Sequence, residues 1–386
     1  MTVKGLGKIC KIKSPNCILL RNIEDFESGI KLAMDISLSI YRFVIAVRGS
    51  KNGNDLLTSD GRLVSHILGI FHKIINMLEN EILPCPVFDG GPPDLKKNAL
   101  NERKKAKIKA KEKLSSGTNL DDYIKTRLSK KSFCIKDDHI KSLQILLIYM
   151  GIPFIQSIGE ADAQCAALSL ANKVDGVITE DWDALPFGTL KMLKDFSNKK
   201  QIKEINLKKL LKDLRLTHDQ FIELCILLGT DYCIGIKGMT PIQIYELYSE
   251  ILDLEIFIQI LNKMNKNLIK NGKLPRYEFP EDFLVKAKET KEYYLKTEVI
   301  DPEKIEIKWN EPNYDKLQEF LCNEFELDRN KIKKKIDLLK YLYQEYKRKI
   351  SSVRTRKNKY LKKKYKNYSP IVYKYNSPYQ NKRIFF

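Results

Sequence analysis

The stretch IKLAMDIS, residues 30–37, begins as an apolar, strand-like run and ends in an acid, Asp35. Runs of this kind, rich in apolar residues and closed by a polar or turn-forming residue, are typical of buried strands. Two later stretches repeat the pattern: LPCPVFDGGPP, residues 83–93, with Asp89 before a Gly-Gly-Pro-Pro turn, and VDGVITEDWDAL, residues 174–185, with Asp181 and Asp183.

Helical apolar spacing separates these strands, over residues 37–47, 65–79, 139–149 and 160–171. Strands that alternate with helices predict an α/β fold with a mostly parallel sheet. In such sheets the ligand lies beyond the carboxyl ends of the strands. We therefore expect the acids that follow the strands to converge, although they are far apart in the sequence.

Three more acids join this group. Glu160 and Asp162 lie in the first turn of a predicted helix in PFIQSIGEADAQCAAL, and Asp231 follows the end of another helix in LCILLGTDYC. Taken singly, Glu160 and Asp162 are equally explained as favourable charges at a helix N-terminus. Seven clustered carboxylates, however, repel one another unless cations neutralise them, and Mg²⁺ prefers oxygen ligands of this kind. Two such ions would suit an in-line displacement at a phosphodiester.

The net charge points to a polyanionic partner. The 386 residues carry a formal charge of +20, of which the last 40 residues, 347–386, supply +14 without a single acid. This tail is predicted to be poorly ordered. A second basic block at Lys96–Lys113 has nine Lys or Arg against two Glu, a composition that is also typical of a solvated helix face. The sequence shows no membrane span or signal peptide, and its scattered cysteines lack metal-site spacing.

Five stretches of the chain resemble the flap endonucleases of the XPG-type structure-specific nuclease family, in the family's order: AMDISLSIYRFVIAVR, VFDGGPPDLK, GEADAQCAAL, TEDWDALPFG and LLGTDYCIGIKG. The resemblance extends from Met1 to about Ile350. It implies a PIN-like α/β core with a helical arch and a helix-two turn-helix module. It also implies that the metal-binding acids are Asp35, Asp89, Glu160, Asp162, Asp181, Asp183 and Asp231, with two Mg²⁺ ions per site that Mn²⁺ can replace.

The resemblance assigns roles to two basic residues of the arch. Lys96 and Arg103 are seven positions apart, which puts them on one helix face two turns apart. Both match family positions that reach the scissile phosphate, where they would stabilise charge in the transition state.

Further positions match residues that contact DNA in the family. Tyr41 matches the aromatic that stacks on a base near the cleavage point, although a Tyr at helical spacing also fits an ordinary core position. The other matches are Arg48, Lys73 and Gly238. Carbonyls near Gly235 and Ile236 match a K⁺ site of relatives.

Some features depart from the family pattern. The module has Thr240 and Ile242 where relatives have Gly and Lys, and the acidic loop after Arg48 is reduced to Asp60. The C-terminal residues Ile384, Phe385 and Phe386 are candidates for binding a sliding clamp, but their spacing from Gln380 differs from the family motif.

The resemblance favours a monomeric, Mg²⁺-dependent 5′ flap endonuclease with 5′→3′ exonuclease activity, acting in DNA replication and repair. Its expected location is the nucleus or another site of replication, the cytoplasm for a viral protein, and it is not secreted. The alternatives are a related 5′→3′ exonuclease, a junction or bubble nuclease, or a non-catalytic, clamp-associated DNA-binding factor. The expected divisions are 1–108 (nuclease region with the start of the arch), 109–138 (rest of the arch), 139–255 (nuclease region with the helix-two turn-helix module), 256–346 (C-terminal helices) and 347–386 (basic tail).

Overall fold

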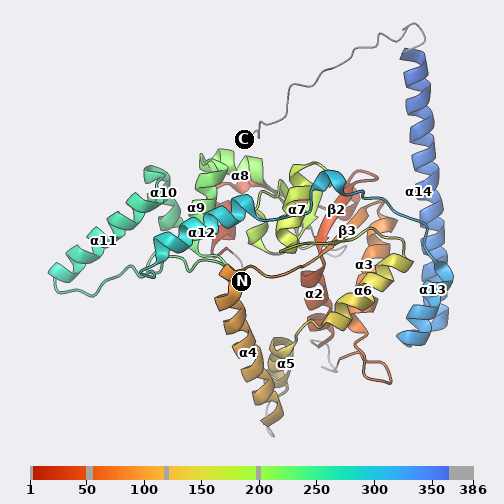
Figure 1. Ribbon diagram of the computed structural model, residues 1–386, viewed down its shortest axis with the longest axis horizontal. Helices are drawn as coiled ribbons and strands as arrows, with labels where there is room; N and C mark the ends of the chain where they lie inside the picture. Colours follow the sequence, from red (N-terminus) through yellow and green to blue (C-terminus); the bar gives the residue numbers. More distant parts are fainter. Residues whose placement is uncertain (1–2, 49–54, 117–120, 197–200, 365–386) are drawn as a thin grey trace. The chain divides into compact units, whose positions relative to one another are not determined.

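The computed structural model describes residues 3–48, 55–116, 121–196 and 201–364 of the chain (Figure 1). Its contacts separate two units, Met1–Asp337 and Leu338–Phe386. The first unit contains the sheet and all the predicted metal-binding acids. The fold class predicted from the sequence, a mostly parallel α/β sheet flanked by helices, is confirmed.

The described residues form a seven-stranded sheet in the order β1-β7-β6-β5-β2-β3-β4. The central strands, from β6 to β4, run parallel, whereas β7 is antiparallel to both β1 and β6. Bulky apolar side chains make β3 buried along its whole length, which suits a strand covered on both faces. The strands are β1 (Ile18–Arg21), β2 (Lys31–Asp35), β3 (Leu83–Phe88), β4 (Ile155–Gln156), β5 (Gly176–Ile178), β6 (Lys191–Lys194) and β7 (Ile202–Asn206).

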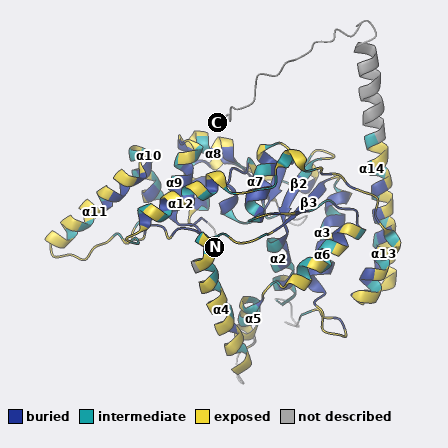
Figure 2. Cartoon of the chain, in the orientation of Figure 1, coloured by how far each residue is buried: buried dark blue, intermediate teal, exposed yellow. Residues whose placement is uncertain are grey.

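Helices cover both sides of the central strands. α7 (Ala161–Leu170) packs on β2, β3 and β5, while α3 (Ser65–Glu79) packs on β3 and against α6 (Asp137–Tyr149) and α2 (Ile36–Arg48). In Figure 1, α7 lies to one side of β2 and β3, and α3 and α6 lie to the other. Figure 2 shows the burial that follows, with β2 and β3 enclosed between these layers.

The basic block predicted to form an arch is helical. A 3₁₀ turn, η3 (Asp94–Lys96), leads into α4 (Lys97–Ser116), which packs against α5 (Asp122–Ser132). Both helices are largely exposed, and the two project together from the sheet (Figures 1 and 2). Since α4 is polar around most of its circumference, its packing on α5 must help to hold it in place.

The helices after the sheet surround a second part of the hydrophobic core, in which Phe221, Tyr248 and Phe257 are fully buried. α10 begins with a capping box in which the Thr240 side chain accepts from Gln243 N, so Thr240 supports the helix start. The remaining helices of this unit are α1 (Leu6–Lys13), α8 (Leu207–Leu214), α9 (His218–Leu228), α10 (Pro241–Ile251), α11 (Leu254–Lys270), α12 (Phe283–Lys296) and α13 (Tyr314–Glu319).

The C-terminal end differs from the expectation of a poorly ordered tail. α14 begins at Arg329 and continues to Lys364, so the first part of the predicted tail is helical. Lysine and arginine have good helix propensity, and no proline occurs between Arg329 and Ser369. Residues 365–386, including the clamp candidates Ile384, Phe385 and Phe386, lie outside the described residues. None of the helices in the described part of the chain combines the length and apolar character needed to cross a membrane.

Candidate active site

Three of the predicted acids lie at one edge of the sheet. Asp35 is the last residue of β2, Asp89 follows β3, and Asp181 lies three residues beyond β5. Because β2 pairs in parallel with both β3 and β5, these carboxyl ends are adjacent, as the sequence predicted. The Asp35 carboxylate also accepts backbone hydrogen bonds from Ser37 N at 2.8 Å and Leu38 N at 3.3 Å, which fix it at the start of α2.

The first turn of α7 brings two further acids to this edge. Asp89 Oδ1 accepts a hydrogen bond from Ala161 N at 3.0 Å and so holds the start of α7 against the end of β3. Glu160 occupies the N-cap position, and Asp162 lies in the first turn. The Asp162 carboxylate is buried, and its Oδ1 has no hydrogen-bond partner. An unsatisfied carboxylate oxygen in this position is unusual and calls for a cation.

Asp183 and Asp231 complete the group. Asp181 Oδ1 accepts from Asp183 N at 3.1 Å, and Asp183 Oδ1 accepts from the Tyr294 hydroxyl at 2.9 Å. Asp231 lies just beyond the end of α9 and is also buried. All seven predicted acids therefore lie where the sheet edge, α7 and the end of α9 meet.

The electrostatics link these acids into one group. Burial raises the pKa of Asp35 well above its ordinary value, and the charges of Asp89 and Asp181 raise it further. Burial raises the pKa of Asp162 in the same way, with added contributions from Asp35, Asp181 and Asp89. Asp183 follows the pattern, since its pKa is raised by burial and then by Asp181 and Asp231. Holding all these groups ionised at neutral pH therefore requires compensating positive charge.

The arch supplies part of that charge. Lys96 forms an ion pair with Glu160, and its Nζ is 3.7 Å from Asp231 Oδ2. Arg103 donates to the Asp231 carboxylate from the second turn of α4. Burial alone would lower the pKa of Lys96, but Glu160, Asp231 and Asp162 together raise it. Both arch residues that the family resemblance singled out thus contact the acidic group.

Comparison with known proteins identifies the architecture. The XPG N-terminal domain matches residues 1–110, and the XPG I-region matches residues 151–231. Flap endonuclease 1 of Danio rerio is 37% identical over 338 residues, which cover 86% of this chain and 85% of that protein. The chain belongs to the XPG nuclease family. XPG nucleases are metal-dependent, structure-specific hydrolases.

Solved structures of XPG nucleases share the fold. The catalytic core of Rad2 in complex with a DNA substrate superposes with a TM-score of 0.66 at 29% identity, covering 87% of this chain and 99% of that one. Flap endonuclease-1 from Methanococcus jannaschii superposes with a TM-score of 0.64 at 26% identity, covering 85% of this chain and 97% of that one.

In this XPG nuclease, two acids of the candidate site are paired with lysine and arginine side chains of the arch. Among the described residues, no group of three or more histidine, cysteine, aspartate or glutamate side chains is already disposed to hold a metal ion. Glu160 and Asp231 are instead bound by Lys96 and Arg103. The donor set nevertheless fits hard divalent cations, because it consists of carboxylates and includes the unsatisfied Oδ1 of Asp162, a residue whose pKa is raised by burial.

The predicted base-stacking residue, Tyr41, lies on α2 beneath the arch. It is half-buried and packs edge-on against Phe133, with 5.3 Å between the ring centroids and an interplanar angle of 83°. Lys107 Nζ donates to the Tyr41 hydroxyl at 2.8 Å. Tyr41 is thus a contact point for the arch and not a core residue of α2.

Two residues predicted to bind DNA, Arg48 and Lys73, make contacts within the protein. Arg48 forms a bidentate pair with Asp55, at 2.6 Å for each bond, and donates to the Ser129 carbonyl. Its side chain is only 12% exposed, so any phosphate contact requires these bonds to open.

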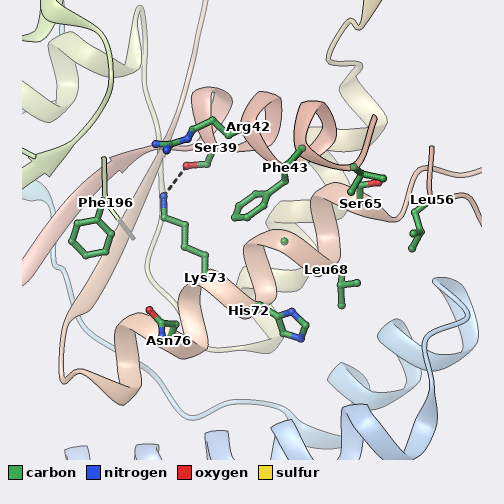
Figure 3. A pocket seen from close by; sticks show the side chains of 13 residues that line it. Ser39, Arg42, Phe43, Leu56, Ser65, Leu68, His72, Lys73, Asn76 and Phe196 are labelled. Carbon is green, nitrogen blue, oxygen red and sulfur yellow. Dashed lines mark hydrogen bonds between the residues drawn. The ribbon is translucent and has the colours of Figure 1, made fainter. Parts of the chain in front are cut away.

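Lys73 borders a cavity of about 640 Å³ between α2 and α3, where it donates to Ser39 Oγ at 3.2 Å (Figure 3). Burial, followed by the charge of Arg42, lowers the pKa of Lys73 to about 8. Lys73 is thus half-buried beside this cavity, near enough to Asp35 to feel its charge, and its contact with DNA stays a prediction.

Gly238 lies in the turn before α10, with a positive φ of 89°. A Cβ atom here would lie 2.1 Å from the Arg276 carbonyl oxygen, so no other residue fits the turn without a backbone shift. Gly235 and Ile236 lie in the preceding loop, where Ile236 N donates to the Leu227 carbonyl at 2.9 Å. The turn is therefore rigid and leads directly into α10.

Sequence reasoning missed two tyrosines behind the acids. Tyr232 donates to Glu160, and Tyr294 donates to Asp183. Tyr232 directly follows Asp231, and that adjacency is a signal that could have singled it out. Tyr294 is 111 residues from its partner and has no local signal. Both orient carboxylates of the candidate site through hydrogen bonds.

Proposed function

We propose that the chain is a structure-specific 5′ flap endonuclease that hydrolyses DNA phosphodiesters near the junction of single strand and duplex, in DNA replication and repair. The observation that carries the proposal is the convergence of seven acids with Lys96 and Arg103 from the arch. A protein that only bound DNA would gain nothing from buried carboxylates, because they repel the phosphates that it holds.

The proposed metal ligands are the seven acids, Asp35, Asp89, Glu160, Asp162, Asp181, Asp183 and Asp231, with Mg²⁺ as the ion and Mn²⁺ as a substitute. Two divalent ions bound here would lower the pKa of water and stabilise the leaving oxygen of an in-line displacement. The chain's own residues orient this site: Asp89 fixes the start of α7, while Tyr232 and Tyr294 hold Glu160 and Asp183.

The arch residues act on the substrate side of the acids. Lys96 and Arg103 lie close enough to Glu160 and Asp231 to contact a phosphate that enters the same space. Their charges would then stabilise the negative charge that develops in the transition state. Tyr41 would stack on a base at the junction, because one aromatic ring suits any base there.

DNA outside the site is bound by other parts of the chain. The backbone N–H groups of the turn at Gly238, ahead of α10, would bind a duplex phosphate, and carbonyls near Gly235 and Ile236 would hold K⁺. The basic C-terminal residues add contacts that do not depend on sequence. Activity on DNA places the protein in the nucleus or at another site of replication, and Ile384, Phe385 and Phe386 are its proposed clamp contact.

The choice of the flap branch over other XPG branches is supported by sequence identity. Flap endonuclease 1 of Danio rerio is 37% identical over 338 residues, which cover 86% of this chain. In the structural superpositions, the Rad2 core and the archaeal flap endonuclease are 29% and 26% identical, so those identities do not separate the branches. The fold itself does not separate the branches, since the TM-scores for the Rad2 core and for the archaeal flap endonuclease are 0.66 and 0.64. A 5′→3′ exonuclease or a junction or bubble nuclease is therefore the alternative outcome of the test.

The test is a cleavage assay on labelled 5′ flap, bubble, four-way junction and linear duplex DNA, each with Mg²⁺ and with a chelator. We expect cleavage of the flap near its junction, only with Mg²⁺, at a rate at least tenfold above that for the other substrates. Asp181→Ala is the matched inactive control. Preferred cleavage of the bubble or the four-way junction would move the chain to another XPG branch, and absence of all cleavage would leave a DNA-binding protein.

A further inference from the structure

Tyr41 lies between the two helices of the arch. From α4, Lys107 Nζ donates to the Tyr41 hydroxyl at 2.8 Å and is 5.2 Å from the ring centroid. From the end of α5, Phe133 packs edge-on against the same ring at 5.3 Å. Both helices of the arch therefore contact one side chain of α2.

Phe133 is itself held from two directions. The Arg48 guanidinium lies 5.1 Å from the centroid of its ring, and His139 stacks on the ring at 6.0 Å with an interplanar angle of 13°. Arg48 is fixed in turn by the bidentate pair with Asp55 and by the Ser129 carbonyl. Phe133 is therefore braced against α2 and α6.

Tyr41 also borders an open hollow of about 480 Å³. Leu38, Ile45 and Ala46 of α2 line its apolar part. Its charged lining residues are Lys130 of α5 and the ion pair of Arg42 with Glu180. The hollow combines an aromatic ring, aliphatic side chains and a cation, the chemistry that accepts an unpaired nucleotide. The orientation of the Tyr41 ring therefore determines how a base can lie in this hollow.

We propose that Lys107 and Phe133 are positioning residues that set the Tyr41 ring for stacking on the unpaired base. The proposal rests on the stacking role of Tyr41 in the proposed function. Lys107 holds the ring by its hydrogen bond to the Tyr41 hydroxyl, and Phe133 holds it by edge-on packing against the ring. An arch that moves away from α2 releases both contacts, so the stacking surface forms only when the arch is in place.

A double-mutant cycle tests the proposal. Tyr41→Phe removes only the hydroxyl, and Lys107→Met removes only the ammonium group while keeping the length of the side chain. We expect each variant to lower the single-turnover cleavage rate on a saturating 5′ flap about tenfold, and the double variant to lose no more than either single variant. Lys109→Met, at an exposed position of the same helix, should cleave at the parental rate.

A second readout needs no cleavage. A 2-aminopurine base placed at the junction, with Ca²⁺ in place of Mg²⁺, reports base stacking by its fluorescence. We expect Tyr41→Phe, Lys107→Met and Phe133→Leu to reduce the fluorescence change on binding by at least half, with the Kd for DNA within twofold of the parental value. Lys107→Arg, which keeps a donor, should restore most of both signals.

The outcomes distinguish the positioning role of Lys107 and Phe133 from the stacking role of Tyr41. Independent, multiplicative losses in the double variant, or a weaker Kd with normal cleavage at saturation, would make Lys107 a phosphate contact and overturn the positioning role. If Tyr41→Ala itself cleaves and stacks normally, the stacking role of Tyr41 fails, and the positioning proposal fails with it. Mg²⁺-dependent flap cleavage by that variant would leave the proposed nuclease function intact.

Discussion

Arg103 in the second turn of α4 pairs with Asp231, an acid that lies 128 positions further along the chain, just beyond the end of α9. Lys96 reaches the same carboxylate and also binds Glu160. Without metal, two of the seven acids are thus neutralised by side chains of the arch. In the proposed metal site the arch cations and the divalent ions would share these carboxylates, so their binding would be linked.

This linkage gives two opposite effects for one substitution. Lys96→Met should lower the single-turnover cleavage rate by two or more orders of magnitude, since a preorganised charge at the transition state is worth about 3 kcal/mol. The same variant should bind Mg²⁺ several-fold more tightly without DNA, as measured by calorimetry, because Glu160 and Asp231 lose a competing cation. Lys97→Met is the control, because Lys97 pairs with the exposed Asp94. Unchanged Mg²⁺ affinity would show that the ion pairs do not compete.

Removing a proposed metal ligand should separate catalysis from binding. Asp181→Ala is expected to abolish cleavage while DNA binding stays equal or becomes tighter, because one repulsive carboxylate is lost. Asp35, Asp89 and Asp231 should behave alike. Binding is measured by fluorescence anisotropy and folding by circular dichroism. Loss of both folding and binding in the Asp181 variant would indicate a structural role for this acid.

The raised pKa values predict how stability depends on pH. Asp35 and Asp162 hold their protons more tightly in the folded than in the unfolded chain. Their contribution to stability is therefore complete below the ordinary pKa of about 3.9 and is lost as the pH rises through the raised values. In the proposed site Mg²⁺ would replace those protons, so the rise in Tm on adding Mg²⁺ should be larger at pH 8 than at pH 5.5.

Asp162 allows a sharper version of this measurement, because its buried Oδ1 has no partner. Asp162→Asn should stabilise the metal-free protein at pH 8 by on the order of 1 kcal/mol, since one pKa unit is worth about 1.4 kcal/mol. It should also reduce the rise in Tm that Mg²⁺ produces. A variant that is less stable than the parent at pH 8 without metal would mean that the charge of Asp162 is compensated within the protein.

The basic C-terminal residues should govern the salt dependence of DNA binding. Deleting Lys347–Phe386 removes 14 cations and no acids. Each neutralised phosphate adds about 0.9 to the slope of log affinity against log salt, so the slope should flatten by several units. The preference for flap over duplex should survive, because the residues assigned to selection precede Lys347. An unchanged slope, or a collapse of that preference, would mean that this segment takes part in recognising the flap.

The sequence predicted the sheet and its acids because both follow from local pattern. A buried run that ends in an acid marks the carboxyl end of a strand, and parallel pairing of β2 with β3 and β5 brings Asp35, Asp89 and Asp181 together. The partners of those acids could not be read in this way. Tyr294 comes from a helix whose own pattern shows only amphipathic packing, and Lys107 is one of nine cations in its block. The helix in residues 347–364 was missed because propensity, and not apolar spacing, supports it.

The edge strand β1 pairs with β7, where Ile18 lies opposite Ile205 and Arg21 opposite Ile202. A ribosome adds about 5–20 residues per second, so β7 is synthesised roughly 10–40 s after β1. During that time β1 has no partner strand. The last of the seven acids, Asp231, is made later still. A growing chain therefore carries an incomplete set of carboxylates throughout the synthesis of its sheet, and the complete acidic group forms only after the whole sheet has been translated.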